Sequence, residues 1–496
     1  MVTAPVGASS TAPQTPSAPA ETPIDVGWPL VILAVGMLVV LGLIIGLKVN
    51  AFIALITAAM VVSLMASGPL ADKIARVATA FGQSAGKIGI VIAMAAVIGK
   101  CMLDSGAADR IVRAFLRLFG ERRAPAALMG SGFVLAIPVF FDTVFYLLVP
   151  LARSLYRRTG RHYLLYVLAI AAGGAITHTL VPPTPGPLVM ADQLGFPFGV
   201  MILVGAVVAL PSAIAGLLFS GLADRLMPVP MRPIGAAPEP EPLADSELPS
   251  LGLSLAPVVL PVLLISADTL YPVLVSATGA SVTAGTWLAT MGSIIAVLGN
   301  ANLALLASAV IALLTLAVQR GLTRTELARV VEVALMSGGV IILITAGGGA
   351  FGAMLKQAQV GEAIKQVFAG AQAAGLMILL LGFGIAAVLK IAQGSSTVAM
   401  ITGSAMLAGM ASPETLGFHP VYLATAIGSG SLFGSWMNDS GFWIFAKMSG
   451  LTEVEALKSW TIMLLVLAVT GLLMTVLLVM LIPDPTFATA VPNVAQ

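Results

Sequence analysis

Long apolar runs alternate with short polar segments along most of the chain, and several runs approach membrane length. An α-helix needs roughly 20 predominantly apolar residues to cross a bilayer. The pattern therefore predicts an all-α polytopic membrane protein. The apolar runs are Trp28–Leu47, Ala51–Ala66, Ala85–Leu103, Tyr163–Leu180, Phe198–Leu222, Leu255–Leu270, Leu303–Val318, Ala334–Leu355, Tyr422–Phe433 and Thr461–Ile482.

Two segments inside apolar sequence cannot continue a helix. Val181–Pro187 reads Val-Pro-Pro-Thr-Pro-Gly-Pro, and each proline removes a backbone donor and clashes with the preceding turn. Gly428–Gly441 is polar and glycine-rich between apolar flanks. Unpaired backbone at membrane depth is tolerated only inside protein or against a polar cavity. We therefore expect two discontinuous helices that border a substrate site, as in secondary transporters.

A third interrupted stretch is predicted to be a re-entrant hairpin. Ala124–Pro150 is broken at Pro138 and Asp142, and basic residues flank both of its ends. Because basic clusters mark the cytoplasmic side, both ends are expected there. One long tilted span is the alternative. The flanking residues are Arg110, Arg113, Arg117, Arg122 and Arg123 in front, and Arg153, Arg157, Arg158 and Arg161 behind.

A fourth interrupted stretch predicts a second hairpin. Leu376–Met410 is broken at Lys390–Thr397, and the segment Ala411–Pro420 behind it has no Lys or Arg. This hairpin is therefore expected to enter the membrane from the opposite face.

The same order of spans, hairpin, broken helix and final span occurs in each half of the chain. Arg320, Arg324 and Arg329 predict a cytoplasmic loop in the second half, which gives the two halves opposite orientations. We therefore expect two inverted-topology repeats, although chance similarity between glycine-rich helices is an alternative. The expected organisation is a disordered N-terminal tail at 1–25, a first membrane repeat at 26–222, a linker at 223–253, a second membrane repeat at 254–483 and a C-terminal tail at 484–496.

The amino-acid composition is that of a membrane protein and not of a soluble one. Of 496 residues, 58% are hydrophobic and only 9% are charged, whereas soluble domains carry roughly 25% charged residues. This charge density excludes a water-exposed surface and a nucleic-acid partner. Cys101 is the single cysteine, and the three histidines are widely spaced without metal-ligand spacing. The sequence therefore predicts no enzyme, no metal and no cofactor.

Four motifs resemble the gluconate–proton symporter family, within the ion-transporter superfamily. They are Ile137–Asp142, Ile176–Pro187, Gln393–Met400 and Asn438–Trp443. The resemblance covers most of the chain after the tail. It implies a bacterial inner-membrane permease that imports gluconate-like sugar acids with protons, and both termini are expected in the periplasm. Many members have a histidine where Thr184 stands, which leaves the choice among hydroxylated acids open.

Three ionisable residues are candidates for proton coupling. Asp142 lies in the first hairpin, Asp439 in the second break, and His178 one turn before the first break. An ionised carboxylate is costly at membrane depth, which favours a proton-carrying role. The structural alternatives are a helix N-cap for either aspartate and a packed histidine for His178.

Neutral donors and backbone N–H groups at the breaks suit a polyhydroxy carboxylate. Lys390 is expected to snorkel toward an interface or to meet an anion. The substrate-binding candidates are Thr177, Thr184, Gly186, Gln393, Ser395, Ser396, Thr397, Asn438 and Ser440.

The sequence thus predicts a proton-coupled secondary transporter whose partners are a gluconate-like anion, H⁺ and the lipid bilayer. A sodium-coupled transporter, or one for dicarboxylates or other organic anions, would share the architecture. A homo-oligomer is compatible with this pattern.

Overall fold

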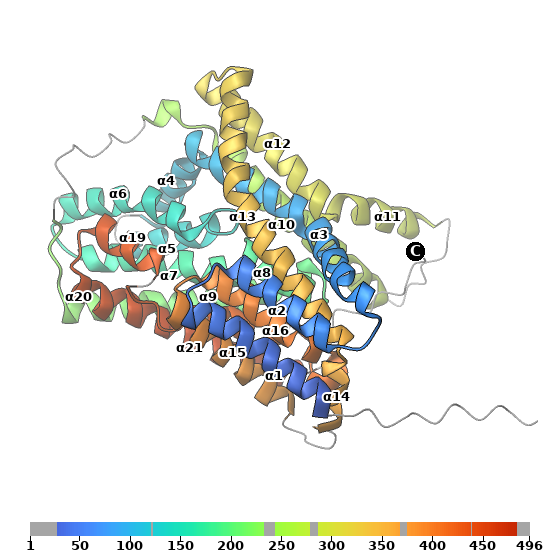
Figure 1. The fold of residues 1–496 in the computed structure, drawn as a ribbon. Helices are drawn as coiled ribbons and strands as arrows, with labels where there is room; N and C mark the ends of the chain where they lie inside the picture. The colour runs from blue at the N-terminus through green and yellow to red at the C-terminus, as the bar shows by residue number, and fades with distance from the viewer. Residues whose placement is uncertain are drawn as a thin grey trace, which may run out of the picture.

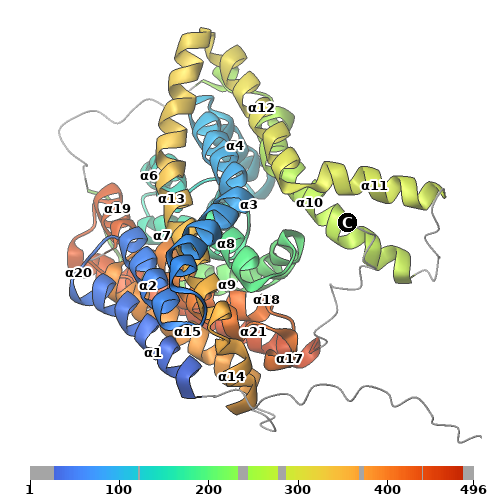
Figure 2. The same cartoon turned by 45° about the vertical axis from the view of Figure 1, so that its right-hand side comes forward.

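The computed structural model describes residues 27–120, 123–232, 244–277, 286–367, 374–437 and 439–483. Within these ranges the regular elements are helices (Figures 1 and 2). Nine helical segments of the described chain are long and apolar enough to cross a membrane. The all-α polytopic fold is confirmed, while both predicted tails lie outside the described residues.

The first half contains nine α-helices among its described residues. They are α1 (Gly27–Leu41), α2 (Ala51–Met65), α3 (Leu70–Asp104), α4 (Ala107–Phe119), α5 (Ala124–Leu135), α6 (Phe141–Thr159), α7 (Tyr163–Leu180), α8 (Pro185–Leu194) and α9 (Phe198–Leu226).

The second half begins with a long helix that leads away from the linker. Its helices are α10 (Leu251–Ala277), α11 (Trp287–Gly299), α12 (Ala301–Arg320), α13 (Arg324–Gln357), α14 (Val360–Val367), α15 (Ala374–Gln393), α16 (Ser396–Leu407), α17 (Pro413–Leu416), α18 (Val421–Gly430), α19 (Ser440–Ser449), α20 (Glu453–Ala456) and α21 (Ile462–Leu481).

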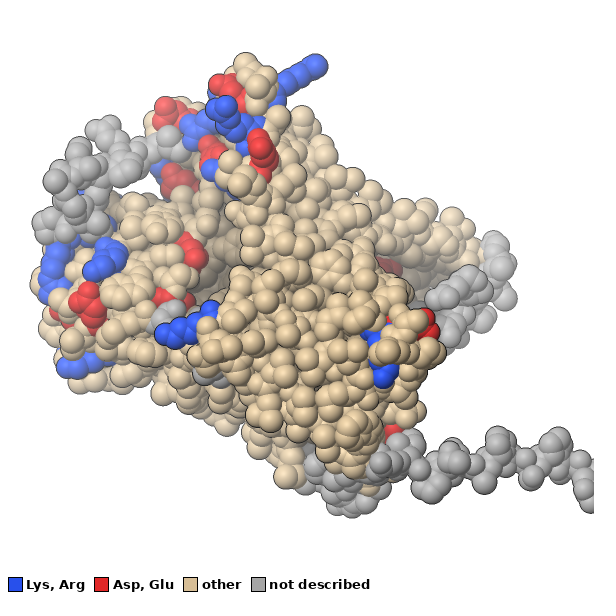
Figure 3. Space-filling view, viewed as in Figure 1, with Lys and Arg blue, Asp and Glu red and all other residues tan. Residues whose placement is uncertain are grey.

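The surface has the distribution expected of a membrane protein. In the face shown in Figure 3, charged side chains gather mainly at the upper end and at the left, and uncharged residues cover much of the rest. Large apolar side chains such as Leu210, Leu218 and Leu473 are exposed along α9 and α21. Contiguous apolar surface of this kind is stable against lipid chains and would be an aggregation hazard in water.

Both hairpins and both broken helices are present. The helix α5 ends before a break at 136–140, and α6 follows it; α15 and α16 flank a shorter break at 394–395. The breaks at 181–184 and 431–439 separate α7 from α8 and α18 from α19. The fold therefore consists of two inverted-topology repeats with re-entrant hairpins and discontinuous helices, and the alternative of one long span through α5 and α6 is wrong.

Several helices lie outside both the predicted apolar runs and the predicted hairpins, and the longest of these are α4 and α11. The helix α4 is amphipathic, with Ile111 and Val112 buried and Arg110 and Arg117 on its polar side. The helix α11 projects from the body together with the end of α10 (Figure 2) and exposes most of its apolar side chains. Its 13 residues are shorter than a full span, so length alone gave no signal.

The described parts of the linker are held at both ends by ion pairs. Arg113 and Arg117 both bind Asp245, and Arg232 makes a bidentate pair with Glu455 at Nη–Oε distances of 2.6 and 2.8 Å. The hydrogen bond from the Arg113 guanidinium holds the pKa of the exposed Asp245 carboxyl below its ordinary value. The connection between the repeats is therefore attached to both halves.

The first hairpin packs against α7 through glycines. A Cβ atom at Gly173 would lie 2.0 Å from the carbonyl oxygen of Met129, and one at Gly132 would lie 2.7 Å from that of Ile170. Because backbone atoms block both positions, only glycine allows α5 and α7 to approach this closely.

We expect Gly173→Ala to destabilise the protein by about 1–3 kcal/mol, since overpacking a rigid contact forces the backbone to shift. Gly221→Ala in α9 is the matched control, because a Cβ there meets nothing within 4 Å. Thermal unfolding in detergent measures both variants. Equal unfolding midpoints for the two would contradict the close-packing interpretation.

Candidate functional site

A buried cavity lies where the hairpin tips meet the broken helices. Its volume is about 120 Å³, and among the described helices α6, α16 and α19 begin at its wall. Helix N-termini present unpaired N–H groups and positive partial charge, which favour an anion. Ionisable and hydroxyl side chains on the wall are Asp142, His178, Lys390, Ser395, Ser396, Thr397, Asp439 and Ser440.

A buried ion pair dominates the electrostatics of this cavity. The Nζ atom of Lys390 lies 2.6 Å from Oδ2 of Asp439, and the two side chains are 2% and 7% exposed. Lys390 also donates to the carbonyl oxygen of Gly394 at 2.6 Å. The expectation that Lys390 snorkels to an interface is therefore wrong, and its ammonium group is held beside the break in the second hairpin.

Asp439 is fixed by several donors besides Lys390. Its Oδ1 accepts the N–H of Gly441 at 2.9 Å, which makes it the N-cap of α19. Its Oδ2 accepts the hydroxyl of Ser435, which itself accepts the indole N–H of Trp460 at 2.8 Å. The capping alternative weighed for Asp439 is thus realised together with the ion pair.

Asp142 occupies a different environment. It is the second residue of α6, whose N-cap is Phe140, so the N-cap alternative does not apply to it. Within the described residues it forms neither an ion pair nor a side-chain hydrogen bond, yet it lines the same cavity as Lys390 and Asp439. Its carboxyl group is therefore available to a proton or a ligand.

His178 lies in the last turn of α7 and is 8% exposed. Its ring packs beside Phe140 with 5.8 Å between the ring centroids, and its Nδ1 has no hydrogen-bond partner in the described part of the chain. A buried polar atom without a partner is costly, so a ligand at this position would gain a hydrogen bond.

Some hydroxyl groups at the second hairpin bond the backbone, and others face the cavity. Ser396 donates to the carbonyl oxygen of Ser431 at 2.8 Å, and Ser395 accepts the N–H of Val398 as the N-cap of α16. Thr397 and Ser440 also face the cavity. The side chain of Gln393 and the whole of Asn438 lie outside the described residues.

Three predicted residues of the first broken helix lie away from this cavity. The hydroxyl of Thr184 donates to the carbonyl oxygens of His178 and Val181 at 3.1 and 2.8 Å, and its side chain borders a smaller, separate cavity. A Cβ at Gly186 would lie 2.1 Å from the methyl group of Met400, so this glycine allows α8 to pack on α16. Thr177 is buried, and its hydroxyl has no partner among the described residues.

Three residues that support the site were not among the predicted site residues: Phe140 and Trp460 on the wall, and Ser435 behind it. Phe140, Trp460 and Ser435 position the ionisable groups, although the apolar and small-residue pattern around them gave no sign of it. Lys390 stood out only as a charge beside a helix break.

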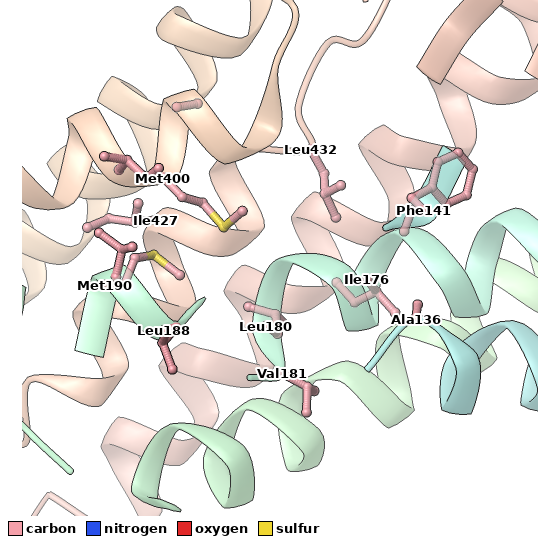
Figure 4. Close-up of a cluster of buried hydrophobic side chains, with 14 of the residues drawn as sticks. Ala136, Phe141, Ile176, Leu180, Val181, Leu188, Met190, Met400, Ile427 and Leu432 are labelled. Carbon is pink, nitrogen blue, oxygen red and sulfur yellow. The ribbon is translucent and has the colours of Figure 1, made fainter. Parts of the chain in front are cut away.

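A layer of buried apolar side chains lies between α8 and α16. Figure 4 shows Met190 of α8 and Ile427 of α18 beside Met400 of α16, with Leu188 and Leu180 farther from Met400. All five side chains are buried. Because close-packed side chains leave no room for a polar solute, this layer blocks the space between the two helices.

Comparison with known proteins gives a consistent result. The family model described as GntP family permease matches residues 28–482. A gluconate permease of Pseudomonas aeruginosa is 36% identical over 439 residues, covering 87% of this chain and 93% of that protein. A gluconate permease of Bacillus licheniformis is 31% identical over 456 residues, covering 91% and 99%. The Gnt-II system L-idonate transporter of Escherichia coli is 33% identical over 448 residues, covering 90% and 98%.

A solved structure resembles the fold. The crystal structure of the Alcanivorax borkumensis YdaH transporter matches with a TM-score of 0.61 and covers 87% of this chain and 97% of that one. At 13% identity this likeness concerns the fold alone. The family match and the permease names of the relatives identify a multi-pass membrane transporter rather than an enzyme. With the family model matching nearly its whole length, the chain belongs to the GntP permease family.

Proposed function

We propose that this protein imports gluconate, or a related small hydroxylated sugar acid, together with protons across the bacterial inner membrane. The observation that carries the proposal is the buried ammonium group of Lys390 in a cavity walled by serine and threonine hydroxyls and by helix N-termini. Relatives named for gluconate and L-idonate support the same class of substrate. In the proposed topology both termini are periplasmic.

The wall chemistry matches a polyhydroxy carboxylate. The substrate carboxylate would be held by Lys390 and the N–H groups at the starts of α16 and α19. Its hydroxyl groups would bond Ser395, Ser396, Thr397 and Ser440, with Gln393 and Asn438 as further candidates from the sequence. A site that pairs each substrate hydroxyl discriminates strongly against analogues that lack one.

The charges of the cavity suggest how protons couple to the substrate. Lys390, Asp439 and Asp142 bring one positive and two negative formal charges when all three are ionised, so their sum repels an anion. Protonating Asp142 makes the sum zero. Proton binding and anion binding therefore favour each other, and His178 is the second candidate to receive or pass the proton.

Uptake of labelled gluconate into proteoliposomes tests this function. We expect accumulation when an inward proton gradient is imposed, and the same accumulation when Na⁺ is replaced by K⁺. An excess of unlabelled idonate, glycerate or a uronate would rank the sugar acids by competition. Accumulation that needs Na⁺ would show that sodium, and not the proton, is the coupling ion. Failure to accumulate any of these acids would refute the proposal.

A further inference from the structure

A second polar cavity lies at the far end of α16. Its volume is about 670 Å³, and the C-terminal parts of α8 and α13 contribute to its wall. The first residues of α16, Ser396 and Thr397, line the central cavity, whereas Ala408 and Gly409, just after its end, line the second. At 1.5 Å per helical residue the two sites are roughly 16–18 Å apart.

The apolar layer of Met190, Leu188 and Met400, drawn in Figure 4, fills the space between α8 and α16. Met400 follows Thr397 by one turn on α16, and Met190 precedes Gln193 by one turn on α8. The second cavity is therefore a vestibule on one side of a closed layer, and a solute that passes this layer reaches the central cavity.

Among the described residues, one lysine of the vestibule has no ion-pair partner. The Nζ atom of Lys87 lies 3.5 Å from Oδ1 of Asp192. Glu362 is the other acid on the wall. Lys356 is exposed to the cavity and forms no ion pair within the described residues. The formal charges of the two lysines and the two acids on this wall add up to zero. The whole wall therefore does not attract an anion, but the ammonium group of Lys356, unpaired in the described chain, does.

Neutral donors of the same wall also lack partners. The amide nitrogen of Gln193 is buried without a hydrogen bond in the described chain, although its Oε1 accepts the hydroxyl of Ser404 at 2.6 Å. Ser84 is 6% exposed, and its hydroxyl likewise has no partner there. Buried polar atoms are normally paired, so two such groups beside an unpaired ammonium indicate a polar ligand.

We propose that this vestibule is a second, weaker binding site for a polyhydroxy carboxylate, which the substrate occupies on its way to or from the central cavity. The inference rests on the proposed function, because it gives the same substrate class a second site. Lys356 binds the carboxylate, while Gln193 and Ser84 bind hydroxyl groups. Weak binding suits this role, since a substrate held tightly in the vestibule would not move on.

Equilibrium binding of labelled gluconate to the purified protein tests the second site. We expect two classes of site in the wild type, loss of the tight class in Lys390→Gln, and loss of the weak class in Lys356→Gln. In proteoliposomes Lys356→Gln should raise the KM of uptake roughly two- to fivefold at an unchanged maximal rate, the size of a partly solvated charge contact. Lys458→Gln is the matched control, because that exposed lysine lies on neither wall.

The outcomes separate the two proposals. A single class of site that Lys390→Gln removes completely would overturn the vestibular site and leave the transport function standing. A wild-type KM in both Lys356→Gln and Gln83→Ala, a second exposed polar residue of this wall, would overturn it as well. A wild type that binds neither gluconate nor another sugar acid would refute the proposed function itself.

Discussion

Asp142→Asn is expected to abolish the accumulation of gluconate that a proton gradient drives. Asparagine keeps the shape of the side chain but cannot bind or release a proton. The formal charge of the cavity therefore stays at zero, the value at which it binds an anion. Gluconate binding in the variant should therefore be independent of pH. In the wild type, the affinity for gluconate should fall by up to about tenfold for each unit that the pH rises once Asp142 ionises, because binding is coupled to one proton.

The fold should tolerate this change, because Asp142 makes no ion pair or side-chain hydrogen bond within the described residues. Asp104→Asn serves as the control, since Asp104 pairs with Lys100 at 2.8 Å outside the central cavity. Counterflow exchange of gluconate, which needs no net proton movement, should survive in Asp142→Asn. Wild-type accumulation by that variant would remove Asp142 from the coupling mechanism.

Lys390→Gln is expected to have the second large effect, on both stability and binding. Removing one partner of a buried ion pair leaves the carboxylate of Asp439 uncompensated, which costs about 3–5 kcal/mol. Loss of the ammonium group from the substrate site should weaken gluconate binding by roughly 30-fold or more. Thermal unfolding and equilibrium binding measure the two effects separately.

A second substitution separates the structural role of Lys390 from its role in binding. In Lys390→Gln/Asp439→Asn both members of the ion pair are neutral, so neither leaves the other as an uncompensated buried charge, and we expect much of the lost stability to return. Asparagine can still accept the N–H of Gly441 and so preserve the cap of α19. Transport should remain absent. Transport that returns together with stability would show that the pair only holds the two breaks together.

The helix breaks could be predicted because their causes are local. Four prolines crowded into Val181–Pro187 end one helix and begin the next, and the small polar residues at 428–441 also favour a break. The hairpin turns near Pro138 and Gly394 follow from the same chemistry. For the same reason Asp142, His178 and Ser396 were found beside breaks, and the structure brings them to one cavity.

Contacts between distant segments could not be predicted in this way. Lys390 and Asp439 are 49 residues apart, and the hydrophobic pattern carries no information about which charges meet. Thr184 was singled out for its place in a break, but its hydroxyl donates to the carbonyl groups of His178 and Val181. The helical partners of these carbonyl groups would be Pro182 and Pro185, which have no N–H. The glycine-mediated crossing of α5 and α7 likewise depends on packing between elements. Local chemistry thus located the irregular segments, and tertiary contacts decided which side chains share the site.

A structure of the protein determined with gluconate bound would show directly whether substrate binds between the hairpin tips. We predict ligand density in the cavity between the two hairpin tips, with the carboxylate about 3 Å from Nζ of Lys390 and hydroxyl groups near Ser395, Ser396 and Thr397. Weaker density in the vestibule at the end of α16 would agree with this prediction. Density only in the vestibule or elsewhere, with the central cavity empty at saturating gluconate, would contradict it.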